Sequence, residues 1–239
     1  MIRSDLHIHT VLSPCGDIEM TPLNIIKKAR ELSVGIIGIT DHNSTLQCSE
    51  VKRIGEREGA FVMCGAEITT REEVHAICFV EDKKLTLLQD YLSSHLPHIP
   101  NKTEFFGYQL VVNEDEEIIH QEPFLLISAL NQTLDQVETF VHSLGGIFIP
   151  AHIDKKQNSL LSQLGFFPPG LRTDAVELSP MCDPEDFFNK NTFLKDQRII
   201  YSSDAHYPQD IGRANTFLEV ANLSFEGVKE AICKLKTGL

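Results

Sequence analysis

Two stretches of the 239-residue chain, Asp5-Leu6-His7-Ile8-His9-Thr10 and Gly35-Ile36-Ile37-Gly38-Ile39-Thr40-Asp41-His42, place histidines at the end of an apolar run. Residues 2–8 are predicted to form a strand. Residues 35–40 show no polar alternation, which is typical of a strand buried on both faces. Between them, Thr21 and Pro22 predict a helix start, because a hydroxyl caps the helix and proline suits its first position. We therefore expect a β-α-β unit with parallel strands.

The same alternation returns along the chain. Further strands are predicted at residues 60–64, 74–80, 147–151, 175–178, 198–202 and 217–220. About seven strands alternating with helices predict an α/β fold, a closed or nearly closed β/α barrel. Residues 83–145 interrupt this pattern with helical stretches around a hairpin, residues 108–112 and 118–120. We interpret 83–145 as an insertion, a small cap, within a single domain spanning 1–239.

Charge and cysteine usage narrow the function classes. With 21 basic and 34 acidic side chains, the net charge of −13 disfavours a module that grips a long nucleic-acid duplex through its phosphates. The six cysteines are scattered without a C-x-x-C pair, which indicates reduced thiols and a cytoplasmic protein. The N-terminus has no apolar signal-peptide core, and no apolar stretch is long enough for a transmembrane helix.

Ten histidines is a high number for a chain with 21 lysines and arginines. Six of them, together with two carboxylates, lie at or just beyond the ends of predicted strands: His7, His9, His42, Glu67, His75, His152, Asp204 and His206. In a barrel of parallel strands these ends converge on one face. Burying so many polar groups together is costly, and divalent metal is the simplest compensation. Imidazole and carboxylate donors suit Zn, Mn or Fe.

Such a cluster predicts hydrolytic chemistry. A metal-activated hydroxide is a nucleophile near neutral pH, so no side-chain nucleophile is needed, and adjacent metals hold both oxygens of a phosphoryl transfer. Bound ions also make the site cationic inside an acidic protein. We therefore expect a small phosphorylated substrate.

The ordered motifs His7-x-His9, Thr40-Asp41-His42, Gly65-Ala66-Glu67, Ala151-His152 and Ser203-Asp204-Ala205-His206 resemble those of the PHP (polymerase and histidinol phosphatase) family. The resemblance implies a distorted (β/α)7 TIM-like barrel with three divalent metal ions. It also implies ligand roles: the first ion is held by His7, His9, Glu67 and Asp204, the second by Glu67, His75 and His152, and the third by Asp17, His42 and His206.

Within the family, the chain looks most similar to small stand-alone members related to nucleoside 3′,5′-bisphosphate phosphatases and short-RNA exonucleases. The implied activity is hydrolysis of small phosphomonoesters, nucleotides or oligonucleotide ends. The histidinol-phosphate phosphatase branch is less similar, because it tends to use histidine at the position of Asp17. Outside this group, an amidohydrolase and a non-enzymatic, metal-binding regulatory module are the alternatives.

Several neighbouring residues receive secondary interpretations. Asp5 and Asp41 are expected to orient adjacent imidazoles, although Asp41 can equally cap the helix that follows. Lys155 and Arg213 are candidate contacts for the substrate phosphate, and Arg213 can equally tie its loop to the barrel. Cys15 is interpreted as a loop thiol. Glu177 ends a predicted strand, and the sequence assigns it no role.

Overall fold

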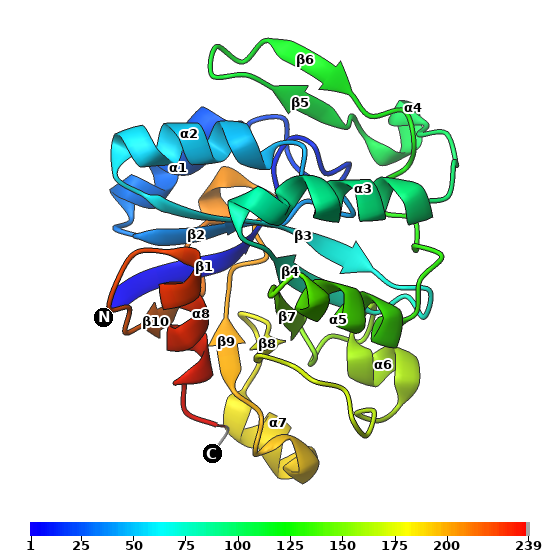
Figure 1. The fold of residues 1–239 in the computed structure, drawn as a ribbon, viewed down its shortest axis with the longest axis vertical. Coiled ribbons are helices and arrows are strands. Elements are labelled where there is room, and N and C mark those ends of the chain that lie inside the picture. Colours follow the sequence, from blue (N-terminus) through cyan, green and yellow to red (C-terminus); the bar gives the residue numbers. More distant parts are fainter. Residues whose placement is uncertain (238–239) are drawn as a thin grey trace.

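The structure is a computed structural model that describes residues 1–237. Its main sheet has six strands in the order β10-β1-β2-β3-β4-β7 and is strongly curled (Figure 1). These strands are β1 (Ile2–Ile8), β2 (Ile36–Ile39), β3 (Phe61–Thr69), β4 (His75–Phe79), β7 (Ile147–Pro150) and β10 (Thr216–Leu218). A two-stranded parallel sheet, β8 (Val176–Leu178) with β9 (Ile199–Tyr201), extends the curl beyond β7.

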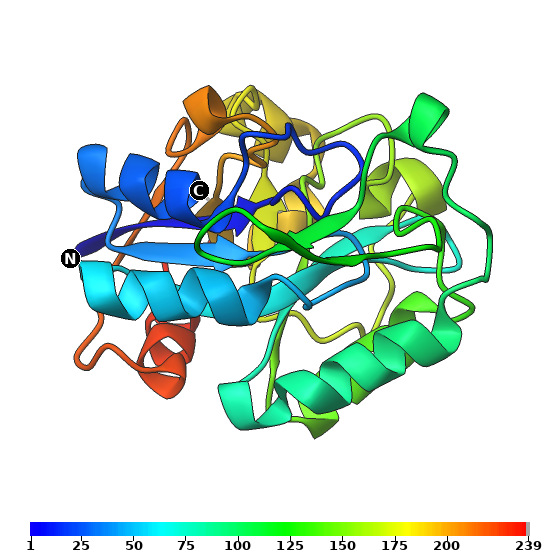
Figure 2. The same cartoon turned by 90° about the horizontal axis from the view of Figure 1, so that it is seen from above.

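The first three strands and the two helices between them form as predicted. Strands β1, β2 and β3 are parallel, and their connections are α1 (Pro22–Glu31) and α2 (Cys48–Glu58). Thr21 caps α1 through its hydroxyl, which accepts a hydrogen bond from the Asn24 N–H at 3.4 Å. Figure 2 shows both helices beside strands β1 and β2.

The expectation of parallel strands all round was wrong for β4 and β10. Strand β4 pairs antiparallel with both β3 and β7, and β10 pairs antiparallel with β1. The residues between β3 and β4 form a short turn, in which the Thr70 N–H donates to the Val74 carbonyl at 2.9 Å. A parallel crossover needs about a dozen residues or more, so this connection permits only a hairpin.

Strand β3 changes partner along its length. Residues 61–64 pair with β2, and residues 65–69 pair with β4. The change occurs at Gly65, where an added Cβ would lie 2.0 Å from the Cys78 carbonyl oxygen. Because β3 runs on to Thr69, Glu67 lies within the strand rather than at its end.

The strands do not form one closed ladder. Between β7 and β8 there are single bonds, such as the Ile153 N–H to the Glu177 carbonyl at 2.9 Å. Between β9 and β10 the Thr216 hydroxyl accepts from the Tyr201 N–H at 2.7 Å and donates to its carbonyl at 3.0 Å. The architecture is therefore a mixed α/β fold with a curled half-barrel sheet.

Residues 82–145 cover one side of this sheet. They contain the short helix Asp82–Lys84, α3 (Leu85–His95), α4 (Thr103–Phe106), the hairpin β5 (Leu110–Val112) and β6 (Ile118–Gln121), and α5 (Leu134–Ser143). The hairpin forms where the sequence predicts it. Helices α3 and α5 bury Leu88, Leu92, Val137 and Val141 in one apolar cluster with β4 residues.

The remaining elements lie after β7. They are α6 (Leu160–Leu164), α7 (Pro184–Lys190), the short helices Thr192–Leu194 and Pro208–Asp210, and α8 (Phe225–Cys233). Among the described residues, no helix is both long and apolar enough to cross a membrane.

Candidate metal centre

The centre is built on the C-terminal end of β1. His7 and His9 are two residues apart along an extended strand, so their side chains point to one side. Both are fully buried, and their Nε2 atoms are 3.2 Å apart. Two imidazole nitrogens at this separation could both coordinate one metal ion placed between them.

Two carboxylates face the same point. Glu67 Oε1 and Asp204 Oδ1 each lie 3.4 Å from His7 Nε2. His9 Nε2 lies 3.4 Å from Glu67 Oε2 and 3.5 Å from Asp204 Oδ1. These separations are longer than ordinary hydrogen bonds. They match the spacing of about 3.4 Å between two donors held tetrahedrally, about 2.0–2.1 Å from one zinc ion.

Glu67 lies between this set and further histidines. Its Oε1 is 2.9 Å from His75 Nδ1 and 3.1 Å from His152 Nε2, and its Oε2 is 3.0 Å from His42 Nδ1. The carboxylate is 1 % exposed. Its oxygens also lie 3.4 Å from His7 and His9, so the carboxylate contacts both that pair and the further histidines, as a bridging ligand would.

Glu177 is the residue that the sequence interpretation missed. Its Oε2 lies 3.0 Å from His7 Nδ1, and the same oxygen accepts the His152 N–H at 3.0 Å. A carboxylate on the second ring nitrogen fixes the tautomer and orientation of a ligating histidine. The available signal was a glutamate in the apolar run 175–178, a residue type that is rarely buried without a partner.

Asp41 supports His9 in the same way, through a hydroxyl. His9 Nδ1 lies 2.9 Å from the Ser13 Oγ, which donates to Asp41 Oδ1 at 2.6 Å. Asp41 also accepts the Thr10 N–H at 2.7 Å. The geometry favours the orienting role over the helix cap.

Asp5 has a different role from the one expected. Its carboxylate accepts the Ser203 N–H at 2.9 Å and the Gly212 N–H at 2.8 Å. It thus anchors the backbone of the loop that carries Asp204, rather than an imidazole. Burial raises the pKa of Asp5 to about 6, although these hydrogen bonds oppose the shift.

The backbone is strained at two of the converging residues. His152 has φ 30° and Asp204 has φ 52°, in the left-handed region that non-glycine residues rarely adopt. Such strain persists where the surrounding structure imposes it and is common at functional sites.

Of the two remaining predicted ligands, His206 and Asp17, only the first lies in the cluster. His206 joins the cluster, and its ring stacks on His9 with centroids 4.2 Å apart. Asp17 does not join: its carboxylate accepts the Glu19 N–H at 2.9 Å. The cysteine two residues earlier lies closer to the histidines. Cys15, His9, His42 and His206 offer donor atoms that all lie within 4.8 Å of one another.

Of the two candidate contacts for the substrate phosphate, only Lys155 lies near the cluster. Lys155 Nζ forms an ion pair with Asp204 and lines the same cavity as the histidines. Arg213 is half exposed and lies 3.4 Å from Asp210 within its own loop. The structure therefore brings Lys155, but not Arg213, to the cluster.

Charge coupling across the cluster shifts several pKa values. Burial alone would lower the pKa of His7, but Glu177, Asp204 and Glu67 outweigh it and raise the value well above the usual range. His9 is raised for the same kind of reason, by Asp204 and Glu67. Burial would raise the pKa of Glu67, yet the surrounding histidines hold it well below its usual value.

His42 and His206 behave differently. Burial, with His9 nearby, lowers the pKa of His206 to about 4, and burial lowers that of His42 as well. These two rings are neutral at physiological pH and can donate to a metal without losing a proton.

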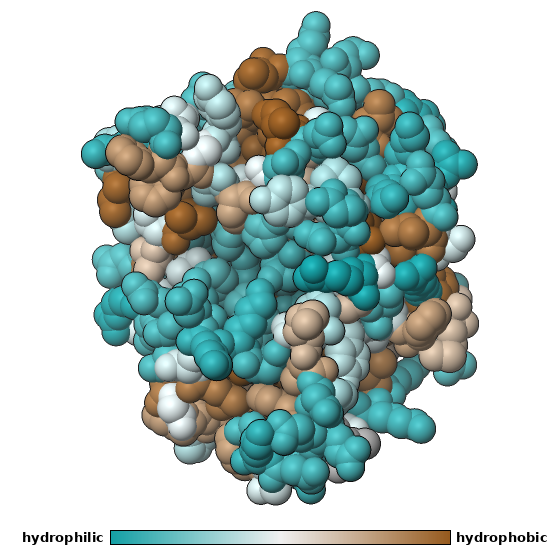
Figure 3. Space-filling model, turned by 180° about the vertical axis from the view of Figure 1, so that it is seen from behind, coloured by the Kyte–Doolittle hydropathy of each residue, from teal (hydrophilic) through white to brown (hydrophobic). Residues whose placement is uncertain are grey.

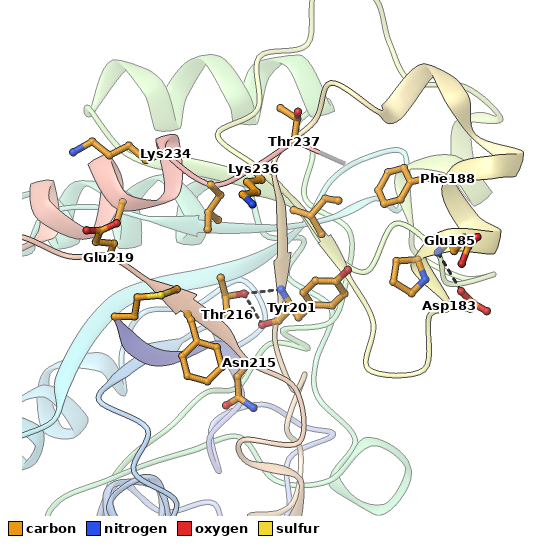
Figure 4. A pocket seen from close by; sticks show the side chains of 16 residues that line it. Asp183, Glu185, Phe188, Tyr201, Asn215, Thr216, Glu219, Lys234, Lys236 and Thr237 are labelled. Carbon is orange, nitrogen blue, oxygen red and sulfur yellow. Dashed lines mark hydrogen bonds between the residues drawn. The ribbon is translucent and has the colours of Figure 1, made fainter. Parts of the chain in front are cut away.

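The cluster opens into a cavity of about 370 Å³, which suits a small ligand. The face of the molecule opposite Figure 1 is mainly hydrophilic at its hollowed centre, with separate hydrophobic groups around it (Figure 3). A larger cavity of about 980 Å³ lies among α7, β9, β10 and α8 (Figure 4). Its lining contains none of the predicted site residues.

The donor set fits divalent metal ions. Imidazoles and carboxylates converge at coordination spacing, ring nitrogens have carboxylate or hydroxyl partners, and the His152 Nδ1 is buried without a hydrogen-bond partner. The other four histidines lie outside the cluster; His142, for example, contacts Asp174 at 3.1 Å.

Comparison with known proteins decides the family. Residues 5–160 match the model of the PHP domain. The chain belongs to the PHP domain family. The matched part of this PHP domain contains seven of the nine expected ligands, and Asp204 and His206 follow it.

Relatives of this PHP domain show the same fold. Endonuclease Q in complex with a 27-mer duplex superimposes with a TM-score of 0.69 at 18 % identity, covering 97 % of this chain and 56 % of that one. A Bifidobacterium adolescentis protein named as a metal-dependent phosphoesterase gives 0.65 at 20 % identity, covering 96 % and 95 %. A Chromobacterium violaceum amidohydrolase with bound sulfate gives 0.64 at 17 % identity, covering 96 % of each chain.

An uncharacterized protein of Methanocaldococcus jannaschii is 34 % identical over 90 residues, which are 34 % of this chain and 53 % of that protein. The chain thus spans about half the length of this relative and of endonuclease Q. These likenesses place the PHP domain among folds that carry metal-dependent phosphoesterases.

Proposed function

We propose that this PHP domain is a metal-dependent phosphoesterase that hydrolyses small phosphomonoesters, nucleotides or oligonucleotide ends. One observation carries the proposal: the buried Glu67 carboxylate lies 3.4 Å from the His7–His9 pair and 2.9–3.1 Å from His42, His75 and His152. A carboxylate in this position binds two adjacent divalent ions, the arrangement that suits phosphoryl transfer.

The proposed ligands follow from the donor groups. His7, His9, Glu67 and Asp204 would hold the first ion, and Glu67, His75 and His152 would hold the second. His42 and His206 contribute to a third, for which the family resemblance implies Asp17. The fold around them is proposed to be a distorted (β/α)7 barrel, with residues 83–145 as its cap in a single domain 1–239.

The ions would activate water as a nucleophile near neutral pH and neutralise charge on the phosphoryl group. The chain's own residues prepare the site for this chemistry. Glu177 holds the His7 ring, and Ser13 with Asp41 holds the His9 ring. Lys155 pairs with Asp204 and lines the cavity, where its ammonium group would contact a substrate phosphate.

Size and charge support a small substrate. The cavity of about 370 Å³ accommodates a nucleotide-sized group. The net charge of −13 disfavours a long phosphate backbone outside the cavity. Endonuclease Q, which was crystallised with a duplex, is about 1.8 times as long as the segment it shares with this chain, and its identity of 18 % carries the fold only.

An amidohydrolase is disfavoured by the bridging residue. That class typically joins its metals through a carboxylated lysine, whereas Glu67 lies at this position here. Lys155 lines the cluster cavity, but its ammonium group pairs with Asp204. It does not occupy the place between the histidines where Glu67 lies.

The test is phosphate release from a panel of nucleotides, oligonucleotides and sugar phosphates, with Mn²⁺ or Zn²⁺ added to metal-stripped protein. We expect turnover on small phosphomonoesters, loss of it in His7→Ala/His9→Ala, and retention in His120→Ala, an exposed histidine outside the cluster. A folded, metal-loaded protein that is inert on every phosphoester, or equal rates on long duplex and mononucleotide, would contradict the proposal.

A further inference from the structure

The loop after β1 folds back tightly on itself. The Ser13 N–H donates to the Thr10 carbonyl at 3.1 Å, and the Gly16 N–H donates to the Ser13 carbonyl at 2.8 Å. A Cβ on Gly16 would lie 2.3 Å from the Thr10 carbonyl oxygen. Only glycine permits this close approach, and the resulting turn fixes the direction of Cys15.

The same turn directs Asp17 away from the cluster. The Asp17 N–H donates to the His206 carbonyl at 2.8 Å, and its carboxylate accepts the Glu19 N–H at 2.9 Å. Asp17 lines a second cavity of about 260 Å³, which Cys15 also borders, but Asp17 does not line the cluster cavity. Its carboxylate stabilises the loop locally, so it is not directed at the histidines.

Cys15 lies where the missing donor would be. Its thiol lines the cluster cavity, and its sulfur lies within 4.8 Å of donor nitrogens of His9, His42 and His206. For comparison, a sulfur at 2.3 Å and a nitrogen at 2.0–2.1 Å from one zinc ion are about 3.5 Å apart.

A second observation points to a ligand on His42, which belongs to the same group of donors as Cys15. His42 is 5 % exposed, and its Nδ1 has no hydrogen-bond partner. Glu67 Oε2 is 3.0 Å away, but the contact lacks the direction of a hydrogen bond. A buried ring nitrogen without a partner is costly, and coordination to a metal satisfies it.

We propose that the Cys15 thiolate, rather than the Asp17 carboxylate, completes the third metal position with His42 and His206. This rests on the metal centre of the proposed function. Binding replaces the thiol proton: the S–H bond breaks, a sulfur–metal bond forms, and the proton leaves to solvent. Because thiolate is a softer donor than carboxylate, this position prefers Zn²⁺ or Co²⁺ over Mn²⁺.

The experiment titrates Co²⁺ into metal-stripped protein and records the visible and near-ultraviolet spectra, with metal content measured after dialysis. Wild type is compared with Cys15→Ser, with Asp17→Asn, and with Cys233→Ser, an exposed cysteine on α8. We expect a sulfur-to-cobalt charge-transfer band in wild type, Asp17→Asn and Cys233→Ser. In Cys15→Ser we expect that band to vanish and the bound metal to fall by one equivalent.

The outcomes separate the two proposals. Cobalt bound with ligand-field bands but without a charge-transfer band overturns the role of Cys15 and leaves the metal centre intact. Loss of one equivalent in Asp17→Asn with full binding in Cys15→Ser also overturns it. Failure to bind cobalt at all overturns both this inference and the metal centre.

A measurement on the unmodified protein guards against a variant that does not fold. Alkylation of native protein followed by peptide mass spectrometry reports each thiol separately. Zn²⁺ is expected to slow modification of Cys15 at least tenfold and to leave Cys233 unchanged. Equal rates for Cys15 with and without Zn²⁺ would overturn the assignment.

Discussion

Replacement of Glu177 by glutamine tests how the centre is held. The Glu177 carboxylate contacts His7 Nδ1 at 3.0 Å and accepts the His152 N–H at 3.0 Å. A glutamine carbonyl placed at the same point still accepts both hydrogen bonds, so the ring stays positioned. The negative charge that raises the basicity of His7 is lost.

The size of the effect follows from that charge. Removing the carboxylate partner of a ligating histidine typically weakens metal binding about 10–100-fold, or about 1.4–2.8 kcal/mol. The assay is competition between the protein and a chromophoric chelator for Zn²⁺ at pH 7. Phosphate release at limiting metal should fall in parallel and recover when metal is in excess.

A matched control comes from a second buried pair. Glu138 contacts His142 Nδ1 on α5 and is 5 % exposed, but it lies outside the metal groups. Glu138→Gln makes the same chemical change and should leave zinc affinity unaltered. If Glu177→Gln binds zinc as tightly as wild type, or no more weakly than Glu138→Gln, Glu177 does not tune the centre.

Four further results are expected. Glu67→Gln should abolish turnover and release at least one metal equivalent by elemental analysis, because a neutral amide cannot bridge two ions; full metal content would contradict this. The pKa values of His7 and His9 are raised, so a metal ion must displace protons from these rings. Metal affinity should therefore rise with pH, and binding should release protons. Calorimetry in buffers of different ionisation enthalpy measures this proton release, and a metal affinity that does not change with pH would refute the prediction. Lys155→Met should raise KM for a phosphomonoester more than it lowers kcat, and an unchanged KM would remove Lys155 from substrate binding. Phe148→Ala, at a fully buried position of β7, should lower the free energy of unfolding by about 3–5 kcal/mol in denaturant titrations, and a loss below about 1 kcal/mol would argue against the packing described.

Several parts of this protein depend only on neighbouring residues, and the sequence by itself determined them. The apolar runs predict β1 and β2, and Thr21-Pro22 predicts the start of α1, because strand periodicity and helix capping act within a few residues. The convergence of His7, His9, Glu67 and Asp204 followed from motif order, since each motif lies on a strand or at its end. These predictions describe residues that the structure brings together.

Other features depend on how distant segments meet, and only the tertiary structure decided them. Glu177 and His7 are 170 positions apart, so no local pattern could pair them. Strand β4 runs antiparallel because the turn before it is too short for a parallel crossover. The alternating pattern of strands and helices does not show how long each connection is. Asp17 and Cys15 are two residues apart in one loop, and both are chemically suitable ligands. The close packing of Gly16 against Thr10 brings the sulfur, and not the carboxylate, to the histidines.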